Sequence, residues 1–192
     1  MTGRDKSLPE PAPPGDDDPF ALRWFRRPDA PALVEICADP EITRWTYMPD
    51  DLDLRGARTW IERRQKARQF GVTASFAVVE RASGTLVGQC GVGLDRQRNA
   101  GEAFYWVAAP ARGRGVARQA LELVLEYAFG PLGVERVELK IDPANEASQA
   151  VARAAGFTHE GTLRSDQPFK GRRMDSQIWS RLPTDPAPRF LR

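Results

Sequence analysis

The stretch from Pro110 to Ala117 combines small residues and arginines in a pattern that can hold a phosphate group. It follows a strand-like run, Glu102–Val107, and it opens an amphipathic segment typical of a helix. Glycines let the backbone approach an anion closely, and the free N–H groups at a helix start favour negative charge. Arginines beside these groups add charge and hydrogen bonds. The stretch therefore predicts a site for a phosphate-bearing cofactor.

The glycine spacing separates this stretch from the common nucleotide-binding loops. The dinucleotide fingerprint G-x-G-x-x-G begins at Gly113 and Gly115, but Arg118 occupies the third glycine position. The sequence contains no G-x-x-x-x-G-K-[ST] loop. Strand-like segments also precede the stretch, whereas a dinucleotide fold usually begins with its loop. A nucleotide-binding module is therefore disfavoured.

The hydrophobic periodicity predicts a mixed sheet flanked by helices. Strands are expected at Leu22–Phe25, Ser75–Glu80, Leu86–Leu94, Glu102–Val107, Val134–Ile141, Phe157–Leu163 and about Asp175–Arg181. Helices are expected at Ala32–Ala38 with Asp29 as a cap, at Leu54–Phe70, at Gly113–Phe129 and from about Asn145 to Ala155. The segment Asp39–Asp53 is expected to be a loop.

Three motifs together resemble the GCN5-related N-acetyltransferase (GNAT) family. Arg112–Ala117 fits its R-x-x-G-x-A acyl-CoA signature, and Asn145–Ser148 resembles its later N-x-x-S element. Gly156–Arg164 resembles the G-F-x-x-E-G-x-L-R ending of the ribosomal-protein N-terminal acetyltransferase (RimJ/RimL-like) branch. The resemblance implies an α/β (α+β) GNAT fold, whose mixed, mostly antiparallel sheet of about six to seven strands is flanked by helices. It also implies acetyl-CoA (coenzyme A) as cofactor and a primary amine as acceptor.

By this resemblance, two neighbouring segments would bind acetyl-CoA. The backbone N–H groups that cradle its pyrophosphate would be those of Gly113, Arg114, Gly115, Val116 and Ala117. The pantetheine arm would pair with the end of the preceding strand, at Trp106, Val107 and Ala108. Arg112 and Arg114 either contact phosphates or remain solvated charges. Trp106 and Val107 also suit simple core packing.

Ser148 and Glu102 are the candidate catalytic residues. Amine acetylation requires that the amine lose a proton and that the departing thiolate receive a proton or a hydrogen bond. By resemblance, the Ser148 hydroxyl would serve the thiolate and Asn145 would contact pantetheine; alternatively, both only cap a helix. Glu102 would take the amine proton, directly or through water, if burial raises its pKa; alternatively, it faces solvent. Part of the branch has a glutamate where this chain has Gln167, which cannot act as a base.

Aromatic and acidic residues in the segment Asp39–Asp53 are candidates for the acceptor site. Trp45, Tyr47, Asp50 and Asp51 can receive a cationic amine through aromatic faces and negative charge. The aspartates equally suit capping of the helix that follows. A peptide or protein N-terminus, an aminoglycoside and a polyamine are all compatible acceptors.

Composition restricts the remaining classes of protein. The 192 residues, 41% of them hydrophobic, predict one GNAT domain at residues 20–182, after a disordered arm (1–19) and before a flexible tail (183–192). Two cysteines and one histidine argue against a disulfide framework, a catalytic thiol and a metal site. The net charge of +2 and the short apolar runs give no case for a nucleic-acid or membrane partner. We expect a cytoplasmic protein, and a homodimer is possible. Two alternatives to the acetyltransferase interpretation stay open: a non-catalytic acyl-CoA sensor, and a transferase that uses succinyl-CoA.

Overall fold

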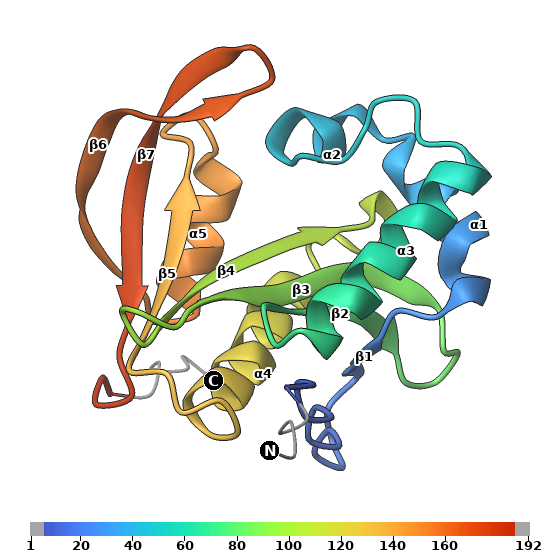
Figure 1. Ribbon diagram of the computed structural model, residues 1–192, viewed down its shortest axis with the longest axis horizontal. Coiled ribbons are helices and arrows are strands. Elements are labelled where there is room, and N and C mark those ends of the chain that lie inside the picture. The colour runs from blue at the N-terminus through green and yellow to red at the C-terminus, as the bar shows by residue number, and fades with distance from the viewer. Residues whose placement is uncertain (1–5, 187–192) are drawn as a thin grey trace, which may run out of the picture.

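The computed structural model describes residues 6–186, which form one sheet covered by helices on both faces (Figure 1). Its strands are β1 (Phe20–Trp24), β2 (Thr73–Glu80), β3 (Leu86–Asp95), β4 (Ala100–Val107), β5 (Arg136–Ile141), β6 (Thr158–Phe169) and β7 (Arg172–Arg181). Its α-helices are α1 (Ala30–Cys37), α2 (Pro40–Trp45), α3 (Leu54–Gln69), α4 (Val116–Phe129) and α5 (Glu146–Ala154). Two short 3-10 helices are η1 (Arg27–Asp29) and η2 (Ala109–Ala111).

The sheet order is β1-β2-β3-β4-β5-β7-β6. β4 and β5 are parallel neighbours, and the other neighbouring pairs are antiparallel. α4 connects the two parallel strands, as a parallel pair requires a crossover. This mixed, mostly antiparallel sheet confirms the expected fold class.

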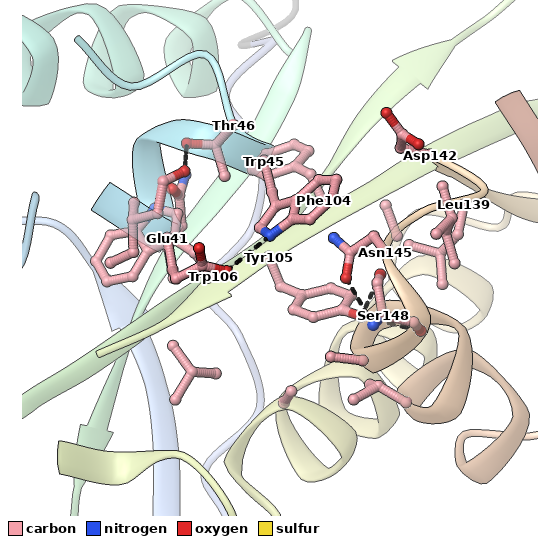
Figure 2. A pocket seen from close by; sticks show the side chains of 18 of the residues that line it. Glu41, Trp45, Thr46, Phe104, Tyr105, Trp106, Leu139, Asp142, Asn145 and Ser148 are labelled. Carbon is pink, nitrogen blue, oxygen red and sulfur yellow. Dashed lines mark hydrogen bonds between the residues drawn. The ribbon is translucent and has the colours of Figure 1, made fainter. Parts of the chain in front are cut away.

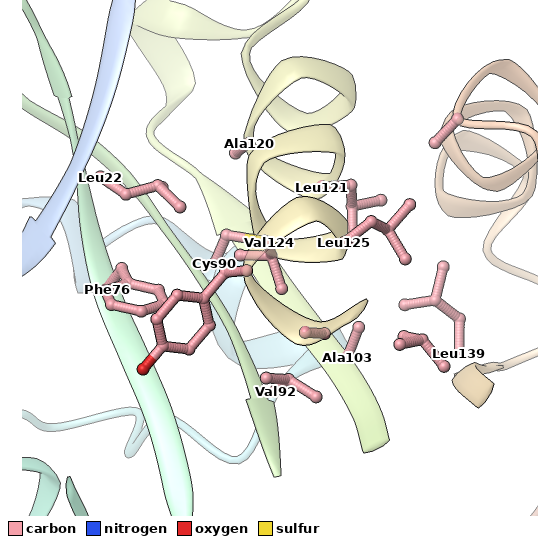
Figure 3. Close-up of a cluster of buried hydrophobic side chains, with 14 of the residues drawn as sticks. Leu22, Phe76, Cys90, Val92, Ala103, Ala120, Leu121, Val124, Leu125 and Leu139 are labelled. Carbon is pink, nitrogen blue, oxygen red and sulfur yellow. The ribbon is translucent and has the colours of Figure 1, made fainter. Parts of the chain in front are cut away.

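Alternating side chains build a separate apolar core on each face of the sheet. On one face, Phe76 and Val92 belong to a cluster with Val124 of α4 (Figure 3). On the opposite face, Val79 of β2 belongs to a cluster with Leu33 of α1. Burial of apolar surface stabilises each layer by about 25 cal/mol per Å². The two helical layers therefore hold the central strand β4 rigidly between them.

The segment Asp39–Asp53 was expected to be a loop. This prediction was partly wrong, since the segment contains the short helix α2. The Asp39 carboxylate accepts a hydrogen bond of 3.0 Å from the Glu41 N–H, and Pro40 occupies the first helical position. Both are strong signals for a helix start, since they satisfy or remove orphan N–H groups. A helix this short lacked the periodic apolar pattern on which the expectation depended.

Asp29 also has a different role from the one expected. Its carboxylate accepts hydrogen bonds of 2.7 Å from the Arg23 guanidinium and from the Arg26 N–H, and none from α1. A charged donor is a stronger partner than a helical N–H group, so the carboxylate faces away from the helix. At the next boundary, α4 begins at Val116 rather than Gly113, because Gly115 has a left-handed φ of 79°.

Residues 6–19 form no helix or strand, yet they lie against the domain. Leu8 is buried in the core cluster of α4, and its N–H donates to the Arg68 carbonyl at 3.1 Å. The Tyr127 hydroxyl donates to the Pro9 carbonyl at 2.8 Å. This part of the arm differs from the disorder expected, because Leu8 offers an apolar side chain to the core. Residues 1–5 of the arm and 187–192 of the tail lie outside the described residues.

Candidate active site

β4 and β5 pair over a short stretch and then separate. Their register joins Ala100–Glu102 to Arg136–Glu138 and extends no further along either strand. Figure 1 shows the two strands diverging beyond this point. A cavity of about 920 Å³ lies at the gap, lined by parts of both strands, of the helices on both faces and of the β6–β7 hairpin. Such a gap exposes backbone hydrogen-bonding groups to an extended, amide-containing ligand.

β4 divides the cavity, because successive side chains of a strand point to opposite faces. Tyr105 points toward α4 and α5, whereas Phe104 and Trp106 point toward α2 and α3. Figure 2 shows Tyr105 beside Ser148 on one side of β4, with Trp45 and Phe104 on the other. We call these two parts of the cavity the α4 side and the α3 side.

The glycine stretch forms one end of the α4 side. Gly113 and Gly115 have left-handed φ values of 73° and 79°, which an L side chain adopts only at a cost. Apart from the glycine itself and its two chain neighbours, no heavy atom lies within 4 Å of the position that a Cβ would take at Gly113 or Gly115. Both residues line the cavity together with Val116 and Ala117. The open N–H groups at the start of α4 therefore suit the anion site that the sequence predicts.

The two arginines of this stretch are held by ion pairs within the domain. Arg112 lines the cavity, pairs with Asp39 at 2.5 Å and donates to the Val107 carbonyl at 3.2 Å. Arg114 pairs with Glu80 at 2.5 Å and lies outside the cavity lining. Contact of either arginine with phosphate stays a prediction. Of the strand residues expected to bind pantetheine, Trp106 and Val107 line the cavity, and Ala108 is buried beside them.

Ser148 forms a tight hydroxyl pair with Tyr105. The Ser148 Oγ lies 2.7 Å from the Tyr105 hydroxyl, and the Ser148 N–H donates to the Asn145 Oδ1 at 3.0 Å. Asn145 thus caps α5, which was one of the two roles expected for it. It also lines the cavity, where the other expected role would place the pantetheine arm. Burial raises the pKa of Tyr105 above its ordinary value, and the bond to Ser148 offsets part of this rise. The tyrosine therefore stays protonated at neutral pH, as a hydrogen-bond donor requires.

Glu102 lies at the last position where β4 pairs with β5, and the cavity begins there. The side chain of Glu102 is exposed, as one of the two alternatives had it. Partial desolvation at the cavity wall nevertheless raises the pKa of its carboxyl, nearby Lys140 lowers this pKa, and the carboxylates of Glu138 and Asp166 raise it further. Lys140 is itself paired with Asp166 at 3.1 Å. A carboxyl with a raised pKa suits proton transfer near neutral pH. Gln167 also lines the cavity, with an amide where part of the resembling branch has a glutamate.

The predicted substrate residues fall into two groups. Trp45 and Tyr47 line the α3 side, and Tyr47 also donates from its hydroxyl to the Pro168 carbonyl at 2.6 Å. Asp50 lies outside the lining. It pairs at 2.8 Å with Lys170, which lies in the turn between β6 and β7. Asp51 is exposed and is also outside the lining. Tyr47 and Asp50 together tie the loop after α2 to the hairpin that covers the cavity.

Sequence reasoning missed Tyr105, Phe104 and Glu41. Tyr105 stood in a predicted strand, and its period-2 position opposite to Trp106 was the available signal. Phe104 faces Gly91 across the sheet, where a Cβ would come within 2.7 Å of the phenylalanine ring. Glu41 was hidden by the missed helix α2; its carboxylate accepts from the Trp45 indole N–H at 3.1 Å.

Thiol and metal chemistry find no support within residues 6–186. Both cysteines are buried, and burial raises the pKa of Cys37 to about 11 and that of Cys90 above its ordinary value. A thiol that stays protonated is a poor nucleophile. No group of His, Cys, Asp or Glu in the described part of the chain could hold a metal ion. In the same part, no helix is long and apolar enough to span a membrane.

Residues 20–158 match the model of the acetyltransferase (GNAT) domain. The chain belongs to this family, and its class is therefore that of a GNAT-type N-acetyltransferase with acetyl-CoA as cosubstrate. The uncharacterized N-acetyltransferase p20 of Bacillus licheniformis is 28% identical over 164 residues, which cover 85% of this chain and 92% of p20.

Two solved structures share the fold. RimJ of Mycobacterium smegmatis, in complex with CoA-disulfide, has a TM-score of 0.78 at 24% identity and covers 85% of this chain and 82% of its own. A RimL ribosomal alpha-N-protein acetyltransferase, in complex with coenzyme A, has a TM-score of 0.79 at 19% identity and covers 88% and 96%. At these identities the two structures show the fold that the motifs predicted.

Proposed function

We propose that this protein transfers the acetyl group of acetyl-CoA to a primary amine by direct attack in a ternary complex. The observation that carries the proposal is the division of one cavity by β4. The Ser148–Tyr105 hydroxyl pair lies on the α4 side, and Glu102 lies where the strands separate. A donor and an acceptor can thus approach each other from opposite faces of one strand.

Acetyl-CoA fits the α4 side. The left-handed Gly113 and Gly115 present a cradle without Cβ atoms to a pyrophosphate, at the N-terminus of a 14-residue helix. The strand end at Trp106 and Val107 runs along the gap, where backbone groups can pair with pantetheine amides. When bound, acetyl-CoA supplies an acetyl group activated as a thioester.

The residues of this chain then take one proton and donate one hydrogen bond. The second proton that the acceptor nitrogen loses passes to the departing thiolate as the C–N bond forms and the C–S bond breaks, which gives the CoA thiol. Glu102 takes the proton of the acceptor ammonium, directly or through water, because its raised pKa makes it a stronger base than an ordinary glutamate. Ser148 donates a hydrogen bond to the departing sulfur, and Tyr105 supplies the donor behind it, since either hydroxyl of the pair can donate. Gln167 orients polar groups at the acceptor end but exchanges no proton.

The acceptor enters from the α3 side, where Trp45 and Tyr47 form part of the wall. The name of the RimL neighbour describes acetylation of a protein α-amino group, which supports a peptide or protein N-terminus as one acceptor class. The largely aromatic wall supports a small amine as the other. Asp50 and Asp51 would attract a cationic acceptor from outside the cavity. The reaction belongs in the cytoplasm, where acetyl-CoA is made and used.

The decisive experiment combines a melting assay with a thiol-release assay. Acetyl-CoA at about 1 mM should raise the melting temperature, because a ligand that binds only the folded state stabilises it. A panel of peptides, amino acids, polyamines and aminoglycosides should then identify an amine that releases CoA thiol. Ser148→Ala is the matched variant, which should keep the melting shift and lose most of the turnover.

Two results would contradict the proposal. The absence of any melting shift with acetyl-CoA, propionyl-CoA or succinyl-CoA would remove the acyl-CoA site. A normal shift without thiol release across the whole panel would instead describe a sensor that binds acyl-CoA and transfers nothing.

A further inference from the structure

Within residues 6–186, two buried hydrogen-bond donors in the wall of the α3 side have no partner. One is the indole N–H of Trp106, and the other is the guanidinium Nε–H of Arg64. Both residues line the cavity. A buried donor without a partner loses its hydration and receives nothing in return, which costs about 1–3 kcal/mol for each group. The described residues contain three other buried polar atoms without a hydrogen-bond partner, all outside the cavity lining, whereas these two donors share one cavity wall, where a ligand can supply the acceptor.

Trp106 is held in place by its neighbours, so its N–H cannot turn away to another partner. The residue is 6% exposed and belongs to the apolar cluster of α1 and α3. Its cross-strand neighbour Gln89 donates from its amide to the Ser75 Oγ at 2.8 Å, and the indole forms no hydrogen bond to the Gln89 side chain. The orphan indole is therefore a fixed feature of the cavity rather than an exposed surface group.

Arg64 brings a positive charge to the same wall. Its guanidinium lies 4.8 Å from the centroid of the Trp60 ring, and within residues 6–186 it forms no ion pair with a carboxylate. Burial lowers its pKa, and the neighbouring charge of Arg63 lowers it further. An arginine placed against an aromatic ring and short of a counter-ion is well suited to bind an anion.

We propose that the acceptor amine carries a carboxylate, and that Arg64 and the Trp106 indole N–H bind it. This inference deepens the proposed transfer reaction and rests on it. A carboxylate has two oxygens, so one can accept from the planar guanidinium while the other accepts from the indole. The surrounding Trp45, Trp60 and Phe104 supply the apolar wall for the rest of the molecule.

The acceptor would have to reach from one side of β4 to the other. The side chains of Tyr105 and Trp106 lie on opposite faces of the strand, and Tyr105 pairs with Ser148. An apolar amino acid or a dipeptide carries both an amine and a carboxylate, whereas a polyamine lacks the carboxylate.

The test compares acceptors that differ only in the carboxylate. Leucine, phenylalanine and tryptophan are each paired with their carboxamide, and one arm uses dipeptides with free and amidated C-termini. The measured quantity is the ratio of kcat/KM for the acid to kcat/KM for the amide. This ratio is compared between variants, so that differences in amine basicity cancel. The dipeptide arm decides whether the bound carboxylate belongs to a free amino acid or to a peptide.

Arg64→Gln should lower the acid-to-amide ratio by about tenfold to a hundredfold, because it removes a charged hydrogen bond. Arg64→Lys should restore part of the ratio, and Trp106→Phe, which keeps an apolar ring without the N–H, should lower it as well. The exposed neighbour Arg63 provides the matched control, and Arg63→Gln should leave the ratio unchanged. Melting temperatures identify any variant that fails to fold.

An unchanged ratio in a folded Arg64→Gln variant would overturn the inference and leave the transferase intact. If no acceptor were turned over, calorimetry on the CoA-loaded protein would decide the question by binding alone. Binding of 3-phenylpropanoate in preference to 3-phenylpropanamide, lost in Arg64→Gln, would support the carboxylate site although the transfer proposal had failed. Equal binding of both compounds would overturn the site as well.

Discussion

The hydroxyl of Tyr105 lies 2.7 Å from that of Ser148, across the gap between β4 and α5. The two residues are separated by 43 positions in sequence, and the parallel arrangement of β4 and β5 brings them together. Burial keeps the tyrosine protonated, so the pair always has a proton to donate. The pair is therefore the natural source of the hydrogen bond to a departing thiolate.

Removal of either hydroxyl should slow the reaction more than it weakens cofactor binding. Ser148→Ala should lower kcat by about a hundredfold, because it removes a donor at the site where charge develops. Tyr105→Phe should lower kcat by about tenfold, since Ser148 still reaches the sulfur. The double variant should be no slower than Ser148→Ala, because the two groups act as one unit. Stopped-flow thiol release checks kcat, and calorimetry with acetyl-CoA serves as the control for binding.

The rate should rise with pH through the pKa of Glu102. Desolvation raises this pKa, so Glu102 loses its proton and becomes a base at a higher pH than an ordinary glutamate does. Below this pKa the residue is protonated and the rate falls. Glu102→Gln should remove this limb from the profile of kcat/KM. Retention of the same limb by the variant would assign it to another group.

The raised pKa of Glu102 also affects stability: ionisation of the carboxyl increases the reaction rate but destabilises the fold. A carboxyl whose pKa is higher in the folded protein favours folding when it is protonated, so its charged form costs stability near neutral pH. Because the side chain is exposed and solvent screens it, Glu102→Gln should raise the melting temperature only slightly at pH 7 and have little effect at pH 4. Asp17, which is exposed in the N-terminal arm, offers a control, and Asp17→Asn should leave the melting temperature unchanged.

The two left-handed glycines at the start of α4 should matter to acetyl-CoA and not only to folding. Gly113→Ala and Gly115→Ala each impose about 1–2 kcal/mol of backbone strain. Apart from the adjacent residues in the chain, their new Cβ atoms meet no protein atom within 4 Å, and both positions line the cavity in which we place the pyrophosphate. We expect acetyl-CoA affinity to fall at least tenfold, as measured by calorimetry.

Gly133 provides the matched control for this experiment. It has a φ of 63°, its Cβ would also meet nothing within 4 Å, and it lies beyond the opposite end of α4. Gly133→Ala should lower the melting temperature by a similar amount and leave acetyl-CoA affinity unchanged. Equal losses of affinity at all three positions would mean that strain alone, and not the cradle, explains the effect.

The N-terminal arm should contribute to stability through Leu8. Leu8→Ala should lower the free energy of unfolding by about 2–5 kcal/mol, the range typical of buried leucines. Tyr127→Phe, which removes the hydrogen bond to the Pro9 carbonyl, should cost about 1 kcal/mol. Urea denaturation measures both. If Leu8→Ala were as stable as the parent, the arm would be bound too weakly to matter.

Contiguous motifs made much of the α4 side predictable. The start of a helix depends on local chemistry, so the glycines at 113 and 115 and the Asn145 cap could be placed without the rest of the fold. The run Glu102–Val107 likewise indicated a strand. The short helix α2 escaped prediction, and with it Glu41, since its start signals lay in a segment without apolar periodicity.

By itself, the sequence determined the class of fold and indicated the glycine stretch and Ser148 as candidate site residues, because each motif consists of residues near one another in the chain. Only the tertiary structure decided what these elements face. The early separation of β4 from β5 opens the cavity, and strand alternation places Tyr105 with Ser148 but Trp106 with Arg64. Such pairings arise from packing between distant elements, where a shift of one residue in register would move every side chain to the other face.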